Sequence, residues 1–593
     1  MWRRGLWCLL LFGICPICRS QADTGIDEIM NLTGAVSVEE LDPDETERLE
    51  KLLSRPLRIN LTSSYRLKES GLFSHYQLVS LEDYRCRHGD VLSMTELSAV
   101  DGFGNEFVRK IAPFISLETS RPAVHIAGSG SRTSHELVAR YGLRKSTSSG
   151  NSYGLRYSMA AGERFSAGLA ISKSTDSSVP DALTGNLCWR FRRRPGQIVT
   201  GSFNARFGQG LALWNGLSIS GLCRPGGFRK RSSSISTSSS FTGRYAFRGI
   251  AAEVLCGRLD ISAAGAFTVE GGVLPALNLT WLWDNGQMGL THYSHIVGVP
   301  VMADDRKTSV DISLTLQGID LFAETAYDWV NASVAALAGT VFPIGEDFRM
   351  AAMLRYYPTS FNPARSAAQR SSTGCTNEYG TSVSAEFFGG KYIKVRGREG
   401  FGASVRRFSG NLCADAACFP VPKGDEETAS VQLRAQYEMD FFVSESLEMK
   451  FRLNERIRSW GQPFRTDLRL DCLWHSGVLG ANLRANVVRS LKTGFLSYAE
   501  LCFRSGIVRL YLRQGFFLVD NWEDRIYAYE RDVPGGFNVP AFYGRGVWTA
   551  LTGSLKFSRW GRLYVRGALT AYPFLPQKKP GRAELKLLLK INL

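Results

Sequence analysis

The sequence has no hydrophobic run long enough to cross a membrane as a helix. The uncharged apolar run from Gly5 to Cys18 is shorter than the roughly 20 residues that a spanning helix needs. The other long uncharged stretch, residues 329–345, is interrupted by Gly and Pro. Arg3 and Arg4 precede the first run, and a small-x-small cleavage site ends at Ala22. We therefore expect residues 1–22 to be a secretory signal peptide, with a retained membrane anchor as the alternative.

Residue patterns that carry catalysis or bind metals are also missing. The chain has 7 histidines, and His292 and His295 stand on a predicted strand at a spacing that puts their rings on opposite faces. There is no nucleophile elbow, no phosphate-binding glycine loop and no zinc-ligand spacing. We therefore predict no catalytic residue, no metal and no cofactor, and we expect a protein that is not an enzyme.

Cysteines are too few and too scattered to define the fold. The chain has 12 cysteines, of which three lie in the predicted signal peptide, and the remaining odd number is spread over the whole chain. Cys413 and Cys418 stand close together in a stretch with loop character. In an oxidising compartment they are candidates for a local disulfide.

The charge of the chain is divided unequally between its two parts. Residues 21–120 contain 10 Lys and Arg against 18 Asp and Glu, a net charge of −8, whereas residues 121–593 contain 58 against 37, a net charge of +21. Residues 23–58 form an acidic, helix-compatible lead-in, whose carboxylates we expect to be solvated. The basic character belongs to the long C-terminal part.

Residues 59–118 have the pattern of short helices joined by tight turns. Asn60 offers N-cap chemistry, Gly71 ends the first helix, and Ser93 caps a short helix that contains Glu96 and Leu97. Gly102, Phe103 and Gly104 form a tight turn into the last helix of the segment.

This segment resembles the tandem helix-hairpin-helix module of ComEA and its relatives. The resemblance implies DNA binding without sequence preference, because the glycines of such a hairpin let backbone N–H groups reach a phosphate while the central apolar residue packs in the core. The implied phosphate-binding residues are Gly102, Phe103, Gly104, Arg109 and Lys110. Residues 51–118 are nearly neutral, with nine Lys and Arg against eight Asp and Glu. A structural or protein-docking role for the module is therefore the alternative.

After residue 120 the pattern changes to segments of about ten residues with alternating apolar and polar residues, which is typical of a transmembrane β-barrel. One such segment runs from Val431 to Asp440, and a final one ends at Leu593. We count 22 to 26 such segments and predict a mainly β protein, with one large antiparallel outer-membrane barrel over residues 121–593. Arginines on the polar faces are candidates for a basic lumen, the alternative being that they pair with inward Asp and Glu; they are Arg434, Arg452, Arg456, Arg484, Arg509 and Arg513.

Two further segments, Phe207 to Trp214 and Ile526 to Asp532, are similar to segments of outer-membrane barrel proteins that carry an N-terminal helix-hairpin-helix module. This resemblance implies a location and an architecture. The basic, Ser-rich stretch from Arg224 to Ser240 interrupts the strand rhythm, and we expect it to be a surface loop, with a loop folded into the lumen as the alternative.

The sequence thus predicts an outer-membrane barrel with a periplasmic helical module ahead of its first strand. One functional hypothesis is the uptake or passage of DNA, with DNA held by the second hairpin. The alternative is a transporter or assembly protein in which the module plugs the barrel or docks another envelope protein. The expected partners are outer-membrane lipid and, according to the hypothesis, DNA or that envelope protein.

Overall fold

The computed structural model describes residues 25–593 with several gaps. The gaps are residues 37–40, 55, 63–65, 68–69, 120–132, 147–148, 163, 192–194, 217–220, 242–245, 269–270, 298–301, 346, 396–402, 425, 462–463 and 575–579. The predicted signal peptide, residues 1–22, lies outside the described residues. None of the helices in the described part of the chain is long and apolar enough to cross a membrane.

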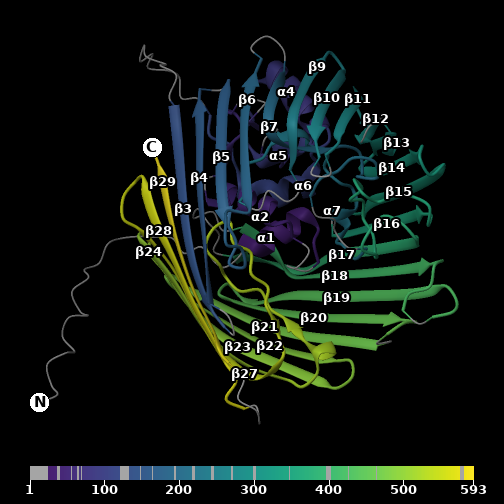
Figure 1. The fold of residues 1–593 in the computed structure, drawn as a ribbon. Coiled ribbons are helices and arrows are strands. Elements are labelled where there is room, and N and C mark those ends of the chain that lie inside the picture. The colour runs from purple at the N-terminus through teal and green to yellow at the C-terminus, as the bar shows by residue number, and fades with distance from the viewer. Residues whose placement is uncertain are drawn as a thin grey trace, which may run out of the picture.

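The described strands form one closed antiparallel barrel of 24 strands, which confirms the predicted fold class and falls within the predicted range (Figure 1). Neighbouring strands follow one another in sequence, and the last strand, β29, pairs with the first barrel strand, β3. The barrel strands are β3 (Thr133–Lys145), β4 (Ser149–Ala161), β5 (Phe165–Lys173), β6 (Ala182–Arg190), β7 (Gly196–Arg206), β9 (Phe247–Cys256), β10 (Leu259–Phe267), β11 (Val273–Trp283), β12 (Gly286–Val297), β13 (Met302–Leu316), β14 (Ile319–Asp328), β15 (Ser333–Ile344), β16 (Phe348–Tyr357), β17 (Glu378–Val395), β18 (Ala403–Phe419), β19 (Ser430–Ser444), β20 (Leu447–Arg458), β21 (Phe464–Ser476), β22 (Leu479–Arg489), β23 (Thr493–Arg504), β24 (Val508–Val519), β27 (Gly544–Lys556), β28 (Gly561–Ala571) and β29 (Arg582–Asn592).

Tight turns join many of these strands. Between β13 and β14 the two turn residues, Gln317 and Gly318, both have positive φ, at 50° and 83°. Two central residues with positive φ define the type I′ turn, whose twist matches that of an antiparallel hairpin. Sequential hairpins of this kind let the sheet progress strand by strand around the ring.

The barrel wall has its apolar side chains outside and its polar side chains inside. On β19, Val431 and Leu433 are 42% and 46% exposed, whereas Gln432 and Gln436 on the opposite face are 7% and 3% exposed. The alternation predicted from the sequence is therefore correct, and the apolar half of it faces outward. An exposed apolar belt around a closed barrel is the surface that a lipid bilayer covers.

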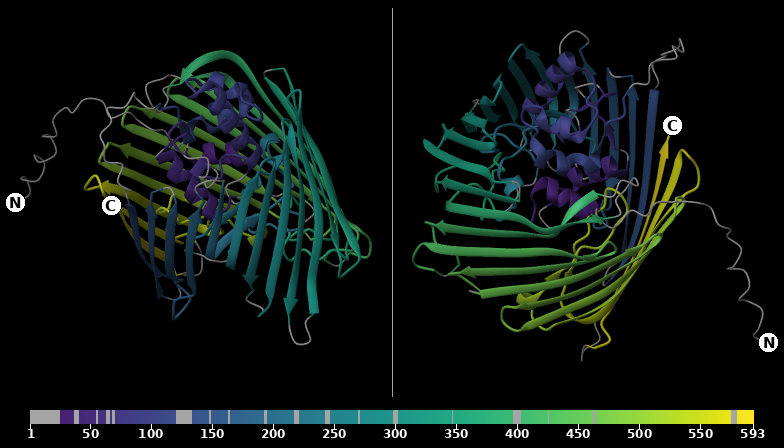
Figure 2. Two further views of the ribbon diagram at one scale, coloured as in Figure 1. Left: turned by 90° about the horizontal axis from the view of Figure 1, so that it is seen from above. Right: turned by 180° about the vertical axis from the view of Figure 1, so that it is seen from behind.

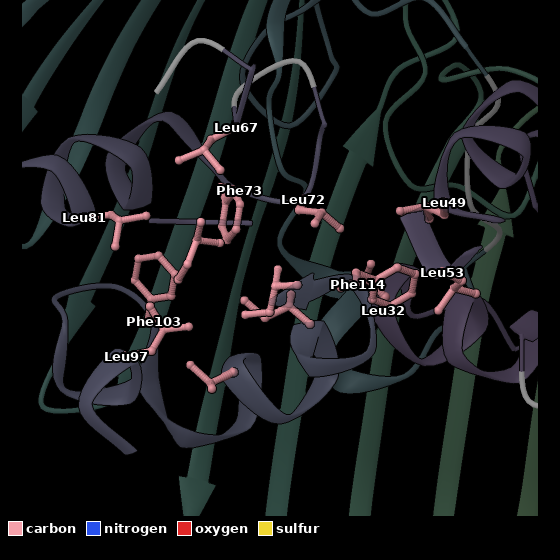
Figure 3. Close-up of a cluster of buried hydrophobic side chains, with 14 of the residues drawn as sticks. Leu32, Leu49, Leu53, Leu67, Leu72, Phe73, Leu81, Leu97, Phe103 and Phe114 are labelled. Carbon is pink, nitrogen blue, oxygen red and sulfur yellow. The ribbon is translucent and has the colours of Figure 1, made fainter. Parts of the chain in front are cut away.

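The N-terminal helices form one small folded unit, which we call the helical module. A single apolar cluster includes residues from the lead-in, such as Leu32 and Leu53, together with Phe73, Phe103 and Phe114 from the later helices (Figure 3). A short parallel pair of strands adds a backbone link between the lead-in and the end of the module, because Leu57 pairs with Ile115. The elements of the module are α1 (Gly25–Thr33), α2 (Pro43–Ser54), β1 (Leu57–Arg58), α4 (His75–His88), α5 (Met94–Ala99), α6 (Gly104–Ile111), the 3-10 helix η2 (Ala112–Phe114) and β2 (Ile115–Ser116).

The helical module lies inside the ring of strands (Figures 1 and 2). Both views of Figure 2 show its helices, drawn in purple, enclosed by the barrel wall. The sequence predicted a module in the periplasm ahead of the first strand, with a module that plugs the barrel as the alternative. The structure agrees with that alternative on position, because the module lies in the lumen and contacts the wall through the ion pairs described below.

Three connections between strands also fold into the lumen. In the first of them, the described residues 207–216, 221–241 and 246 include the short helix α7 (Pro225–Phe228) and the strand β8 (Ser234–Thr237), and α7 contacts α1, β15, β16 and β17. The prediction of a surface loop from Arg224 to Ser240 is therefore wrong, because Phe228 is 2% exposed and the serines of β8 are buried. The other two connections run from β16 to β17 and from β24 to β27; the latter contains η3 (Trp522–Asp524), β25 (Ile526–Tyr527) and β26 (Ala541–Phe542).

The predicted disulfide between Cys413 and Cys418 is wrong, and both thiols are free. Both residues lie on strand β18 rather than in a loop. Five residues along a strand span about 17 Å and end on the opposite face, which is far beyond the reach of a disulfide. Cys413 points inward, where its thiol lies 3.1 Å from the Ser384 hydroxyl.

Candidate functional site

The second hairpin of the module has the backbone geometry that its glycines suggest. Gly102 and Gly104 have φ of 80° and 64°. At Gly102 a β-carbon would also lie 2.5 Å from the ring of Tyr76, so both space and backbone conformation require glycine there. Phe103 between them is buried, with its ring centroid 5.8 Å from that of Phe73. The prediction that the central apolar residue packs in the core is confirmed.

Capping residues were predicted with mixed success. The Ser93 hydroxyl accepts a hydrogen bond from the backbone N–H of Glu96 at 3.1 Å, which confirms its role at the start of α5. Among the described residues, which leave out 63–65, no helix cap by Asn60 is seen. Its side-chain amide bonds both the N–H and the carbonyl of Val91, at 3.0 and 2.9 Å, and so joins two turns of the module.

The two basic residues of the hairpin face the barrel wall. The Lys110 ammonium lies 3.6 Å from Glu386 on β17, and burial lowers the pKa of Lys110, although Glu386 opposes that effect. The Arg109 guanidinium lies 5.8 Å from the ring centroid of Phe388, also on β17. The predicted phosphate-binding residues are thus brought together, but they border the space between module and wall.

That space is a cavity of about 910 Å³. The module contributes the turn from Gly102 to Gly104 and the following helix α6, and the wall contributes residues of the strands β12 to β17. The inward connection after β7 contributes Arg229, Lys230 and Arg231. The cavity is therefore lined by three parts of the chain that are far apart in sequence.

Most of the predicted lumen arginines are paired with carboxylates. Arg434 lies 3.0 Å from Asp415, Arg452 lies 2.9 Å from Glu438, and Arg513 lies 2.7 Å from Glu500, while Arg484 pairs with Asp471. The two remaining candidates, Arg456 and Arg509, form no ion pair within the described part of the chain. For four of the six arginines, the alternative, pairing with inward Asp and Glu, is therefore correct.

Ion pairs also join the helical module to the barrel wall. Asp27 contacts Lys450 on β20 at 2.7 Å, Lys51 contacts Glu136 on β3 at 3.0 Å, and Asp42 contacts Arg206 on β7 at 3.6 Å. A fourth pair joins Glu47 to Arg156 on β4. The lead-in carboxylates, expected to be solvated, thus include residues that bind the wall. The opposite net charges of the two parts of the sequence meet at this interface.

The first family-like segment, Phe207 to Trp214, is bound by one buried carboxylate. Glu324 on β14 accepts hydrogen bonds from the backbone N–H groups of Gln209, Leu211 and Ala212, at 2.6, 3.1 and 3.3 Å. Gly208 and Gly210 have positive φ and turn these N–H groups toward one point. The alternating glycines were the available sequence signal, but they did not reveal an acceptor more than 100 residues away.

The second family-like segment, Ile526 to Asp532, also binds the wall from inside. Arg531 lies 3.0 Å from Glu500, Asp532 lies 2.5 Å from Lys586, and Glu530 pairs with Arg566. Shortly after it, Phe537 packs against the apolar cluster of the helical module. This connection therefore links the module to strands near the barrel seam.

The histidines of β12 serve the wall and point apart, as predicted. His292 bonds the Thr308 hydroxyl at 2.8 Å, whereas His295 bonds Asp304 at 2.6 Å and Thr268 at 2.8 Å. Among the described residues, no group of three or more His, Cys, Asp or Glu side chains is arranged to hold a metal ion.

No protein-family model and no curated protein sequence matches this chain. Solved structures with a similar fold include the siderophore receptor PirA from Pseudomonas aeruginosa, at 11% identity and a TM-score of 0.38 over 80% of this chain and 81% of that chain. The translocation pore of the P pilus usher PapC has 10% identity and a TM-score of 0.39 over 77% and 99% of the two chains. OccK11 from Pseudomonas aeruginosa has 9% identity and a TM-score of 0.28 over 78% and 96%. Likenesses this distant carry no argument about function.

Proposed function

We propose that this protein is an outer-membrane transporter whose helical module closes the barrel and moves to let a solute pass. The observation that carries the proposal is the position of the module in the lumen, where it is joined to β3, β4, β7 and β20 by ion pairs. An outer-membrane location is consistent with a signal peptide followed by a barrel with an exposed apolar belt.

The nature of the interface supports a module that can move. These ion pairs lie outside the apolar cluster of the module, so the module keeps its own core when they break. The pairs of Lys51 and Asp27 are partly exposed and contribute about 1 kcal/mol or less each, whereas those of Asp42 and Glu47 are more buried.

Conductance across a planar bilayer tests the proposal. We expect the full chain to be closed with brief openings, and a variant lacking residues 25–118 to conduct continuously. A second variant, Glu47→Cys with Arg156→Cys in a Cys86→Ser background, is joined with a thiol-specific cross-linker; Cys86 is replaced because its thiol is exposed. We expect the cross-linked protein to show no openings, while the single Glu47→Cys variant treated in the same way opens normally. A folded deletion variant that stays closed would overturn the proposal.

The interpretation of the second hairpin as a DNA phosphate site receives less support. Lys110 is engaged by Glu386, and the hairpin borders an internal cavity. We therefore expect a short DNA duplex to leave the conductance of the full chain unchanged at low salt. Block of the current by DNA that weakens with added salt would restore the DNA hypothesis.

A further inference from the structure

The cavity between the helical module and the wall has features of a binding site for a small molecule. Its volume of about 910 Å³ lies within the range of about 300 to 1,000 Å³ that is typical of such sites. Its walls come from the α5–α6 turn and helix α6, from the strands β12 to β17, and from the connection after β7.

Among the described residues that line the cavity, cations outnumber carboxylates. The carboxylates are Asp101 and Asp320, and the cations are Arg109, Lys110, Arg229, Lys230, Arg231 and Arg349. Arg229 is paired with Asp320 at 2.8 Å, and Lys110 faces Glu386. The positive charge of the lining is therefore only partly neutralised by these pairs.

Three of the cations form no ion pair in the described part of the chain. Arg231 donates hydrogen bonds to the carbonyl oxygens of Leu32 and Leu72, at 2.8 and 3.4 Å, and Lys230 donates to a carbonyl in the connection between β16 and β17. Arg109 is exposed to the cavity beside Phe388. Burial lowers the pKa of Lys230 to about 7, and Glu45 acts on Arg231, so Arg109 is the cation whose charge is left for a bound anion to balance.

A buried amide at the cavity wall points to a ligand with hydroxyl groups. Gln287 on β12 is 8% exposed, and its side-chain oxygen has no hydrogen-bond partner within the described residues. A buried acceptor without a donor costs about 1 to 3 kcal/mol, so a donor from a ligand would be favoured there. The start of helix α6 borders the same cavity and has no side-chain cap hydrogen bond.

Aromatic rings complete the lining. Tyr76, Phe107, Phe348 and Phe388 border the cavity along with hydroxyl residues such as Ser313 and Thr315. Apolar surfaces with a few polar groups orient a ligand that has both apolar and polar faces. A sugar ring has such faces, and a charged substituent would answer the excess of cations.

We propose that this cavity binds a small hydroxylated anion, a sugar that carries a phosphate or a carboxylate group. The inference rests on the proposed transport function only for its physiological meaning, because binding to the closed protein requires no passage. The phosphate and carboxylate forms share the same recognition chemistry, and the measurement below separates them.

Isothermal titration of the full chain in detergent tests the proposal, with glucose 6-phosphate, glucuronate, glucose and inorganic phosphate as probes. We expect saturable binding of at least one anionic sugar, at least tenfold tighter than that of glucose or inorganic phosphate. The comparison of glucose 6-phosphate with glucuronate identifies the preferred charged group. Absence of saturable binding by both anionic sugars would overturn the proposal, whether or not the conductance measurement supports transport.

Two variants and a control connect the binding to this cavity. Arg109→Gln removes an unpaired cation, and Gln287→Leu removes the buried amide at nearly constant size; we expect each to weaken binding of the sugar anion at least tenfold. Arg258→Gln removes an exposed arginine that pairs with Asp284 outside the cavity, and we expect unchanged binding. Migration on unheated gels verifies that each barrel is folded. Equal affinity in folded Arg109→Gln and in the unaltered chain would place the site elsewhere.

Discussion

The helical module and the barrel wall use the same amino acids in opposite ways. The module buries residues such as Phe114 and Leu97 completely and exposes charge, whereas the wall exposes residues such as Leu433 and buries residues such as Gln436. The module therefore folds by removing apolar surface from water, and the wall by satisfying polar groups internally while lipid covers its apolar side. The inner face of the wall is polar, so it offers ion pairs to a module that is itself polar outside.

The largest expected effect comes from the core of the module. Phe114→Ala removes a ring that is 0% exposed, and we expect a loss of about 3 to 5 kcal/mol in the stability of the module. Limited proteolysis followed on gels measures this loss, since the module should become sensitive while the barrel stays resistant. Leu92→Ala, at a site 70% exposed, is the matched control with little expected change. Equal sensitivity of the two variants would contradict the assigned core.

The corresponding test of the barrel wall places a charge on its outer, apolar face. Leu433→Arg places a cation on the apolar belt, and we expect a cost of about 2 to 4 kcal/mol in unfolding from lipid vesicles by denaturant. The control is Leu491→Arg in the turn after β22, where we expect about 0 to 1 kcal/mol because the site is near the membrane edge. If Leu433→Arg were neutral, that face would not contact lipid.

The contact between the helical module and the wall should contribute less free energy than the core of the module or the apolar belt of the wall. Lys450→Met removes the partner of Asp27, which is 43% exposed, and also the contact of Lys450 with Glu448 at 3.4 Å on the same strand. For the loss of the Asp27 pair we expect about 1 kcal/mol and a several-fold increase in channel openings. Single-channel recording measures the change. Lys556→Met, which changes an exposed lysine at the end of β27, serves as the control. Unchanged opening by Lys450→Met would mean that this pair does not hold the module.

Smaller effects are expected from the pH dependence of the docking of the module in the barrel. Burial beside Glu47 and Asp532 raises the pKa of Glu50 to about 7. Because the pKa of Glu50 in the docked module lies above the ordinary value, protonation of Glu50 favours the docked state. This contribution of Glu50 to docking is lost as the pH rises through 7. We expect more openings at pH 8 than at pH 6, and a flatter profile in Glu50→Gln. The opposite slope in the unaltered chain would contradict this account.

Asp27 should respond to pH in the other direction. Burial alone would raise its pKa, but Lys450 outweighs burial and holds the pKa of Asp27 below its ordinary value. Its contribution to docking is therefore present above the ordinary carboxyl pKa and is lost as the pH falls through the lowered one. We therefore expect channel openings to become more frequent in acid. In Lys450→Met we expect the frequency of openings to be insensitive to acid.

The wall could be predicted from the sequence because its pattern is local. Alternation along segments such as Val431 to Asp440 sets which side chains face lipid, and the number of segments agreed with the ring. The position of the module could not be predicted in this way. Lys110 meets Glu386 and Asp27 meets Lys450 across hundreds of residues, so no local period encodes these contacts.

The candidate site shows the same limit. The turn from Gly102 to Gly104 was found because glycine and its spacing are local signals, and its geometry is as expected. Gln287 was not found, because a glutamine on a polar strand face looks like any other until the chain closes around it. Cys413 and Cys418 are the converse case, in which closeness in sequence suggested a bond that an extended strand prevents.

The pairing of β29 with β3 sets an order of events for biogenesis. The barrel closes only when the strand from Arg582 to Asn592 meets the strand from Thr133 to Lys145, so closure waits for the last of the barrel strands. The helical module precedes both strands and is complete in sequence long before. The module can therefore occupy the curved, unclosed sheet first, and the pairing of β29 with β3 then encloses it.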